Sequence, residues 1–152
     1  MKAKRLTHID RSGDAMMVDV SSKPVMTREA VARGEIRLQK STIALIDSQV
    51  MAKGNVLAAA RLAGILAAKK TGELIPLCHP LPLTHCEVNF EIPKSKDRIV
   101  ISASAKIAAQ TGIEMEALTA VSVAALTIYD MCKAVDKQMR ISDIHLVSKT
   151  KK

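Results

Sequence analysis

Residues 84–107 read THCEVNFEIPKSKDRIVISASAKI and carry the clearest strand pattern in the chain. Apolar and polar residues alternate in residues 84–92 and again in residues 98–107, on either side of the turn-forming sequence PKSKD. A period of two places one set of side chains on a buried face and the other in water. Two such runs around a short proline-containing turn are typical of a β-hairpin. We therefore predict two antiparallel strands with one solvated face.

Helices are predicted on both sides of this hairpin. Residues 54–70, GNVLAAARLAGILAAKK, are rich in Ala and Leu and end in two cations, which favours a helix. Thr71 and Gly72 are expected to end it. Residues 113–135 predict a second, longer helix with an acidic first turn and a basic end. Its middle, ALTAVSVAALTI, is apolar or small on nearly every side, so this helix should be buried on more than one side.

Two further strands complete the expected fold, at residues 30–38 and 140–148. The mixture of helices and hairpin strands predicts an α+β fold, a ferredoxin-like antiparallel sheet with helices packed on one face. We expect the open face of the helices to meet another subunit. Residues 1–152 are interpreted as a single domain, with residues 1–12 and 149–152 as loose tails.

The composition restricts the class of function. The chain has 152 residues, is 48% apolar, and carries 23 Lys and Arg against 15 Asp and Glu, a formal charge of +8 that attracts phosphates. One Phe and one Tyr leave few aromatic platforms for stacking bases, which favours a phosphorylated small molecule over nucleic acid. A basic nucleic-acid-binding module remains the alternative. We see no secretory signal or membrane-length apolar run and expect a cytoplasmic protein that binds neither nucleic acid nor membranes.

Residues 74–86, LIPLCHPLPLTHC, connect the first predicted helix to the hairpin and contain two cysteines, two histidines and three prolines. Four of these side chains can bind zinc: Cys78, His79, His85 and Cys86. Both pairs are immediate neighbours, whereas structural zinc sites draw ligand pairs from residues two to four apart, so the spacing disfavours zinc. Neighbours on an extended segment point to opposite sides, which also disfavours His79 as the base of a Cys78 nucleophile. The remaining interpretation is a loop stiffened by prolines that presents His79 to an anion.

Three polar groups lie on or beside the predicted helices, and each has an ordinary explanation. Asp130 and Lys133 are three residues apart and share a helix face, so they form either a surface ion pair or a catalytic pair. Glu114 and Glu116 complement the helix dipole or line a site. Lys53, before the first helix, strengthens an anion site or is simply solvated.

Five strings in this order resemble the molybdenum cofactor biosynthesis protein C family (MoaC): VDVSSK, KGNVLAAARLAGILAAK, LIPLCHPLPL, TGIEMEALTA and VAALTIYDMCKAVDK. The resemblance covers about residues 6–149. It implies a phosphorus–oxygen lyase that acts on a cyclised dihydro-GTP, in which the ribose is joined to the base. The implied product is cyclic pyranopterin monophosphate, formed with release of pyrophosphate, and the substrate triphosphate agrees with the basic charge.

The resemblance also assigns residues. It implies that Asp130 and Lys133 are catalytic and that nine residues contact the substrate: Leu77, Cys78, His79, Met115, Glu116, Glu114, Lys53, Arg28 and Lys149. His85 and Cys86 lie outside the matching motif. No protein-held metal or tightly bound cofactor is expected, and Mg²⁺ is considered only as a companion of the triphosphate. Family members continue past Lys149 with a glycine-rich basic tail, whereas this chain reads SKTKK and stops, which weakens the assignment of Lys149.

The spacing of two implied site residues has a geometric consequence. Glu116 and Asp130 lie fourteen residues apart on one predicted helix, which separates them by about 21 Å along its axis. One small substrate can contact both only if two subunits share the site. The resemblance implies a hexamer, a trimer of dimers, which fits such an interface. A non-catalytic homologue that serves as a scaffold would carry the same motifs and stays open as a further alternative.

Overall fold

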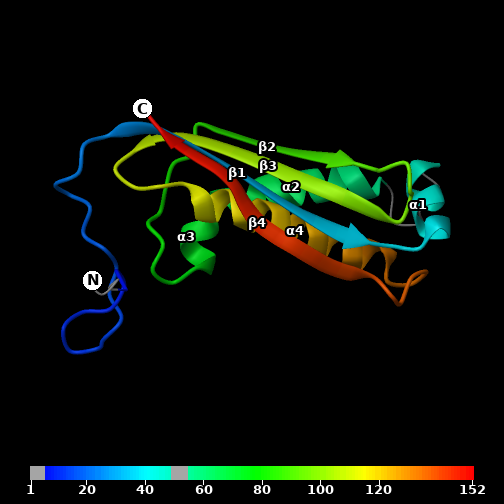
Figure 1. The fold of residues 1–152 in the computed structure, drawn as a ribbon, viewed down its shortest axis with the longest axis horizontal. Coiled ribbons are helices and arrows are strands. Elements are labelled where there is room, and N and C mark those ends of the chain that lie inside the picture. Colours follow the sequence, from blue (N-terminus) through cyan, green and yellow to red (C-terminus); the bar gives the residue numbers. More distant parts are fainter. Residues whose placement is uncertain (1–5, 49–54) are drawn as a thin grey trace.

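A computed structural model describes residues 6–48 and 55–152. Four strands form one antiparallel sheet in the order β2-β3-β1-β4 (Figure 1). They are β1 Met26–Arg37, β2 His85–Glu91, β3 Arg98–Ala109 and β4 Arg140–Lys151. β1 pairs in register with β3 from Met26↔Ala109 to Arg37↔Arg98, so these long central strands form the middle of the sheet. The predicted hairpin is confirmed as β2 and β3.

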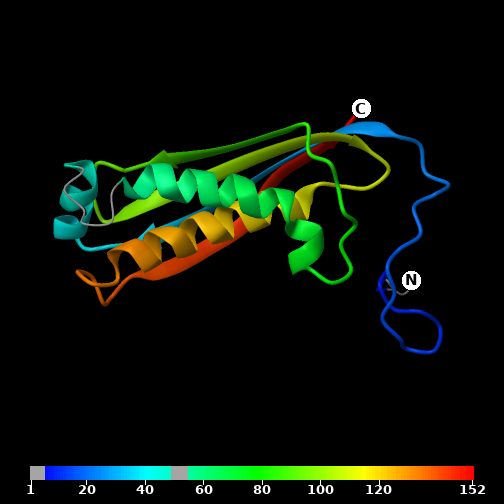
Figure 2. The same ribbon diagram turned by 180° about the vertical axis from the view of Figure 1, so that it is seen from behind.

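The helices cover one face of the sheet, as Figure 2 shows from behind. They are α1 Lys40–Asp47, α2 Val56–Lys69, α3 Thr71–Leu74 and α4 Glu114–Cys132. α2 and α4 lie side by side and form the helix layer. Along the chain, β1 is followed by the helices α1 to α3, then by β2 and β3, by α4 and by β4, and β4 lies beside β1 in the sheet. This order confirms the predicted α+β ferredoxin-like fold.

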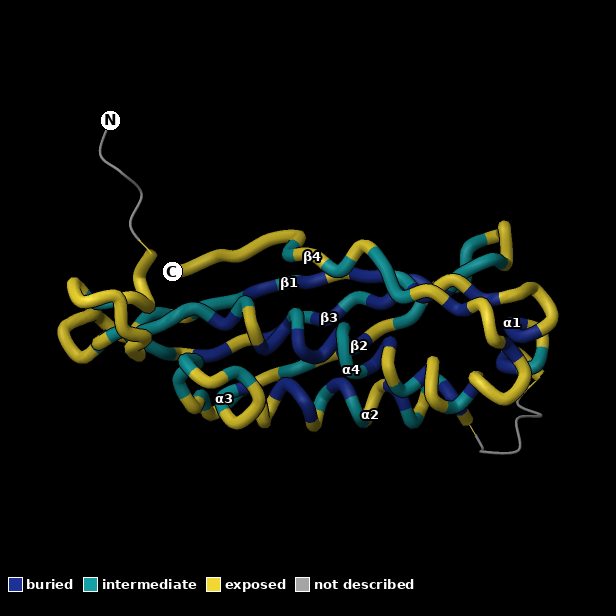
Figure 3. Tube along the Cα trace, turned by 90° about the horizontal axis from the view of Figure 1, so that it is seen from below, coloured by how far each residue is buried: buried dark blue, intermediate teal, exposed yellow. Residues whose placement is uncertain are grey.

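The core lies between the sheet and α4. Ile36 of β1 and Ile101 of β3 are fully buried beneath this helix, whose inward face is built from small residues. Small side chains let the helices approach closely: a Cβ on Gly64 of α2 would lie 2.9 Å from the carbonyl oxygen of Ala120. Figure 3 shows the buried residues running along the middle of the sheet and the inner side of the helices. Alternation in the strands and small residues in the helices therefore fix how the two layers pack.

Among the described residues, α4 has the length and hydropathy of a membrane-spanning helix. However, 56% of its most apolar window is buried inside the fold. The sequence prediction that this helix is buried on more than one side is thus confirmed by its contacts with α2 and with the sheet. Its apolar character is that of a core helix.

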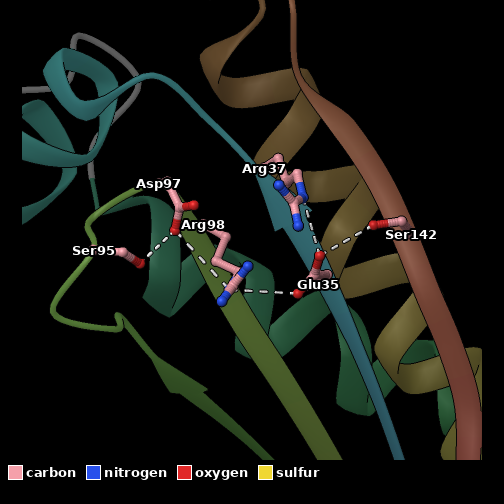
Figure 4. A network of polar contacts seen from close by, with 6 residues as sticks. All are labelled: Glu35, Arg37, Ser95, Asp97, Arg98 and Ser142. Atoms are coloured by element: carbon pink, nitrogen blue, oxygen red, sulfur yellow. Dashed lines mark hydrogen bonds and ion pairs between the residues drawn. The ribbon is translucent and has the colours of Figure 1, made fainter.

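The other face of the sheet carries polar side chains. In β1, for example, Glu35 lies between the buried Gly34 and Ile36 and therefore points away from the helices. The Glu35 carboxylate lies 3.2 Å from Arg37 Nε, 3.5 Å from Arg98 Nε and 3.4 Å from the Ser142 hydroxyl (Figure 4). These contacts join β1, β3 and β4 at the end of the sheet where the β2–β3 turn lies. The network ties the three strands together on the face away from the helices.

The structure changes several predicted boundaries. β1 begins at Met26, four residues before the predicted strand, and α4 ends at Cys132. α2 ends at Lys69, just before Thr71 and Gly72 as predicted, and the separate single turn α3 follows it. The helix α1 was not predicted; its sequence, KSTIALID, is short and has no side-chain cap.

The prediction of a loose tail at residues 149–152 is wrong. β4 continues to Lys151 and pairs with β1 through Ala30↔Lys149 and Arg28↔Lys151. The backbone N–H of Lys152 donates to the Thr27 carbonyl at 2.9 Å, and the Thr27 N–H donates back to Lys152 at 2.9 Å. Residues 149–152 supply hydrogen-bond partners for the backbone N–H and C=O groups at the start of β1, which would otherwise be unpaired. This pairing is why they form a strand despite their polar sequence. In the other predicted tail, residues 6–9 and 11–12 are exposed, and residues 1–5 lie outside the described part.

Candidate active site

The loop after α3 is held in place by backbone contacts and by its histidine. A Cβ on Gly72 would lie 3.0 Å from the Cα of Pro80, so α3 and the loop pack backbone to backbone. The Nε2 atom of His79 lies 2.8 Å from the carbonyl oxygen of Val18. A carbonyl only accepts, so Nε2 carries the proton, and in the neutral ring Nδ1 is the nitrogen available to a ligand. The loop thus presents His79 in one orientation.

A pocket of about 260 Å³ lies beside this loop. Its walls come from three separate parts of the chain: the loop, the start of α4, and an N-terminal segment. Six of the predicted substrate residues line it, namely Leu77, Cys78, His79, Glu114, Met115 and Glu116. The tertiary structure therefore brings together two motifs that are more than thirty residues apart in the sequence.

A second pocket, of about 230 Å³, adjoins the first at Gly112 and Glu114, which line both. Its charged lining consists of three cations, Arg28, Lys149 and Lys151, and two acidic residues, Glu29 and Glu114. Arg28 is held by hydrogen bonds from Nε to the Ala109 carbonyl (3.1 Å) and from a terminal guanidinium nitrogen to the Gln110 carbonyl (3.2 Å). The Nζ of Lys149 donates to the Glu114 carboxylate at 2.9 Å. Lys149 is thus held beside the site by its place in β4 and by Glu114.

Sequence reasoning missed two cations of this region, Lys23 and Lys151. Both line a pocket in the structure. The alternation of β4 holds the signal for Lys151, because residues 149 and 151 are two apart and share the strand face that Arg28 meets across the sheet. Lys23 ends the string VDVSSK that supports the family resemblance, but it was not assigned to the site, because its position depends on how the N-terminal segment folds over the loop.

Three ionisable groups of the first pocket are shifted by their surroundings. Glu116 is only 3% exposed, and burial, followed by the nearby charge of Glu114, raises its pKa despite a bond to its own N–H. Burial and the charge of Glu116 raise the pKa of the Cys78 thiol, which keeps it neutral and unsuited to act as a thiolate nucleophile. Burial also acts to raise the pKa of Glu114, but the hydrogen bonds from Lys149 and from its own N–H, together with the charges of Lys149 and Arg28, outweigh burial and lower the pKa.

These shifts predict opposite effects of two neighbouring Glu→Gln changes on stability. A raised pKa means that the folded protein holds its proton more tightly than the unfolded chain, so stability is lost as pH rises through the folded pKa of Glu116. Glu116→Gln should therefore unfold at higher urea concentration than wild type at pH 8, with the difference shrinking toward pH 4. Glu114→Gln is the matched control: its lowered pKa predicts a loss of stability at pH 8 that fades as pH falls. Equal urea midpoints for all three proteins at pH 8 would contradict both assignments.

Asp130 and Lys133 lie at the opposite end of α4 from the pocket, at its last turn and C-cap. The Lys133 Nζ donates to the Asp130 carboxylate at 2.6 Å, and both side chains are more than half exposed, at 56% and 60%. The bond to Asp130 raises the pKa of Lys133, so the ammonium persists. The structure confirms that Asp130 and Glu116 share one helix and does not bring them together within one chain.

The four possible zinc ligands of residues 74–86 separate into two places. Cys78 and His79 line the first pocket, whereas His85 and Cys86 lie at the start of β2 beside Ile65 of α2. Among the residues that the structure describes, no group of three His, Cys, Asp or Glu side chains is placed to hold a metal ion. The zinc interpretation therefore has no geometric support. Lys53, predicted to contact the substrate, lies outside the described residues.

A ferredoxin-like fold with a cation-lined pocket at the start of its core helix defines a protein suited to an anionic small molecule. The chain belongs to the MoaC family, whose sequence model matches residues 17–152. Its relatives include proteins named cyclic pyranopterin monophosphate synthase. The protein from Parvibaculum lavamentivorans is 56% identical over 150 residues, covering 99% of this chain and 94% of the relative. The protein from Chloroflexus aggregans is 57% identical over 145 residues, covering 95% of this chain and 88% of the relative. The protein from Clostridium perfringens is 55% identical over 145 residues, covering 95% of this chain and 92% of the relative.

Proposed function

We propose that this chain is a cyclic pyranopterin monophosphate synthase of molybdenum cofactor biosynthesis. It converts (8S)-3′,8-cyclo-7,8-dihydroguanosine 5′-triphosphate to cyclic pyranopterin monophosphate and releases pyrophosphate, which makes it a phosphorus–oxygen lyase. The observation that carries this proposal is the 56% identity over 99% of the chain to a relative of that name. The two adjoining pockets, one rimmed by cations, support it independently.

The phosphate groups are bound by the cations of the second pocket. These cations lie on one face of the sheet, at the end where β1 pairs with the last residues of β4: Arg28, Lys149 and Lys151. They can screen the charge of a triphosphate while one oxygen attacks and pyrophosphate leaves. His79 serves the non-phosphate part of the same ligand, because with Nε2–H donating to Val18 the Nδ1 atom of the neutral ring accepts a hydrogen bond from a ligand N–H or O–H. By the family resemblance Lys53 joins them, and Mg²⁺ arrives with the triphosphate rather than on a site of its own.

Two copies of the chain share each active site. Glu116 and Asp130 lie about 21 Å apart along α4, too far for one small substrate to contact both from one chain. Large apolar side chains are exposed on the outer side of the helix layer, which supports a second copy there: Leu62 and Leu66 of α2, and Leu126 and Tyr129 of α4. In this proposal three dimers of this kind assemble into a hexamer, and the protein acts in the cytoplasm.

Asp130 and Lys133 move protons in the shared site. Their 2.6 Å ion pair holds a carboxylate and an ammonium side by side, so one group can accept a proton while the other donates one during ring opening and reclosure. Their exposure in the single chain leaves both accessible to a substrate bound against the neighbouring copy.

The test is an incubation of purified protein with the cyclised dihydro-GTP, followed by measurement of pyrophosphate and of the pterin product. Both products at a rate proportional to enzyme concentration are expected. A folded oligomer that forms neither product would contradict the proposal and favour a scaffold. Submicromolar RNA or DNA affinity that falls steeply with salt would instead favour a nucleic-acid-binding module.

A further inference from the structure

Residues 14–23, which we call the N-terminal strap, form the outer wall of the first pocket. Val18, Val20 and Lys23 of the strap line the pocket opposite the start of α4. The strap lies outside the sheet, since β1 begins only at Met26. Its place therefore depends on contacts other than strand pairing.

The strap is tied to the body of the protein at two points. On the loop side, His79 donates to the Val18 carbonyl at 2.8 Å. On the sheet side, the Nε2 of Gln110 donates to the carbonyls of Ser21 (3.2 Å) and Lys23 (3.1 Å). Between these ties the strap closes a turn, in which the Lys23 N–H donates to the Val20 carbonyl at 2.9 Å. The tie from His79 belongs to a predicted substrate residue, whereas the side chain of Gln110 was not among the predicted site residues, although its backbone carbonyl holds Arg28.

Gln110 is well placed for such a tie. It directly follows β3, and its own backbone carbonyl accepts a hydrogen bond from Arg28 in the second pocket. Its side-chain amide thus links the strap to the strand end that holds a phosphate-binding cation. Only a donor suits this position, because both partners are carbonyl oxygens. A glutamate of the same shape would lose both bonds and place a charge against two acceptors.

We propose that Gln110 is a positioning residue for substrate binding: its amide fixes the N-terminal strap as a wall of the pocket and so places Lys23 beside the phosphorylated ligand. The inference rests on the proposed function for the identity of that ligand. Gln110 does not contact the reacting atoms, so its loss weakens binding and leaves the chemical step intact. KM should rise while kcat changes little.

Gln110→Glu and Gln110→Leu test this proposal, with Asn89→Asp on the edge strand β2 as a matched control outside both pockets. Two lost hydrogen bonds predict a KM for the cyclised dihydro-GTP raised about tenfold, with kcat within about twofold of wild type. Hydrogen exchange supplies a second readout: the Lys23 amide should exchange faster in both Gln110 variants and unchanged in Asn89→Asp.

Each outcome decides the matter. Faster exchange at Lys23 together with a raised KM supports the proposal. Unchanged exchange, or faster exchange with an unchanged KM, overturns it. Wild-type protein without turnover would contradict the proposed function, and the exchange at Lys23 would still decide whether Gln110 holds the strap.

Discussion

Asp130→Asn should lose about 10²- to 10⁴-fold in turnover while retaining the fold and the oligomer of wild type. The side chain is 60% exposed and its hydrogen-bonded partner is the equally exposed Lys133, so the amide removes a proton acceptor without disturbing the core. The measurement is kcat for pyrophosphate release, with thermal melting and gel filtration of the same samples. Asp143→Asn, an exposed aspartate at a positive φ of 55° that asparagine also tolerates, is the matched control and should keep full activity. Wild-type turnover in Asp130→Asn would remove Asp130 from the mechanism.

Mixing Asp130→Asn with Glu116→Gln, once each variant alone is shown to lack turnover, tests whether the site is shared between subunits. Asp130→Asn and Glu116→Gln change opposite ends of α4. If each site combines these two ends from different chains, a mixed dimer contains one doubly changed site and one intact site. Random reassembly of equal amounts should therefore restore about a quarter of wild-type activity. No recovery from variants that demonstrably exchange subunits would place the whole site within one chain.

Asp136→Ala should lower the free energy of unfolding by about 3 kcal/mol, because it removes a buried charged acceptor and leaves its donors without a partner. Asp136 is 1% exposed and lies just after α4. Its carboxylate accepts hydrogen bonds from the Gln39 N–H (2.8 Å), the Gln138 N–H (3.0 Å) and the buried Thr42 hydroxyl (3.1 Å). It thus joins the start of α1 to the connection between α4 and β4. Urea unfolding at pH 7 measures the loss.

The pH dependence provides a second check on Asp136. Burial acts to raise its pKa, but the three hydrogen bonds outweigh burial and hold the pKa below its ordinary value. A lowered pKa means that the carboxylate stabilises the fold above the unfolded pKa, and that this stability is lost as pH falls through the folded pKa. The difference between wild type and Asp136→Ala should therefore narrow as the pH is lowered from 7 toward 3. Asp47→Ala, on the exposed side of α1, is the control and should match wild type within about 0.5 kcal/mol. A loss in Asp136→Ala no larger than in Asp47→Ala would contradict this role.

The fold was predictable to the extent that it rests on local patterns. The alternation of residues 84–92 and 98–107 gave the hairpin, and the Ala- and Leu-rich runs gave α2 and α4 at nearly their observed bounds. The short helix α1 was missed because its eight residues carry a weak signal and its first turn depends on the distant Asp136. The C-terminal residues were expected to be loose because SKTKK has no strand pattern. These residues form a strand because they hydrogen-bond to β1, and no pattern in SKTKK predicts that pairing.

The candidate site shows the same division. The motifs around Glu114, Glu116, Asp130, Lys133 and the proline-rich loop each allowed an ordinary or a functional interpretation, and the family resemblance assigned these residues to the site. Lys23, Gln110 and Lys151 were not assigned, because each acquires its place only from a segment that folds across another. The structure also separates residues that the sequence places together: His79 faces the pocket, and His85 starts a strand elsewhere.

The sequence by itself determined the periodicities, and with them the β2–β3 hairpin, the helices α2 and α4, and the basic charge that attracts a phosphorylated ligand. These properties follow from the order of neighbouring residues and need no long-range contact. The tertiary structure alone decided that the N-terminal strap closes the pocket, that β4 reaches Lys151 and brings two lysines beside Arg28, and that burial raises the pKa of Glu116. Hydrogen bonds between distant segments and the exclusion of water from a carboxylate arise only when the chain has packed, so no local pattern encodes them.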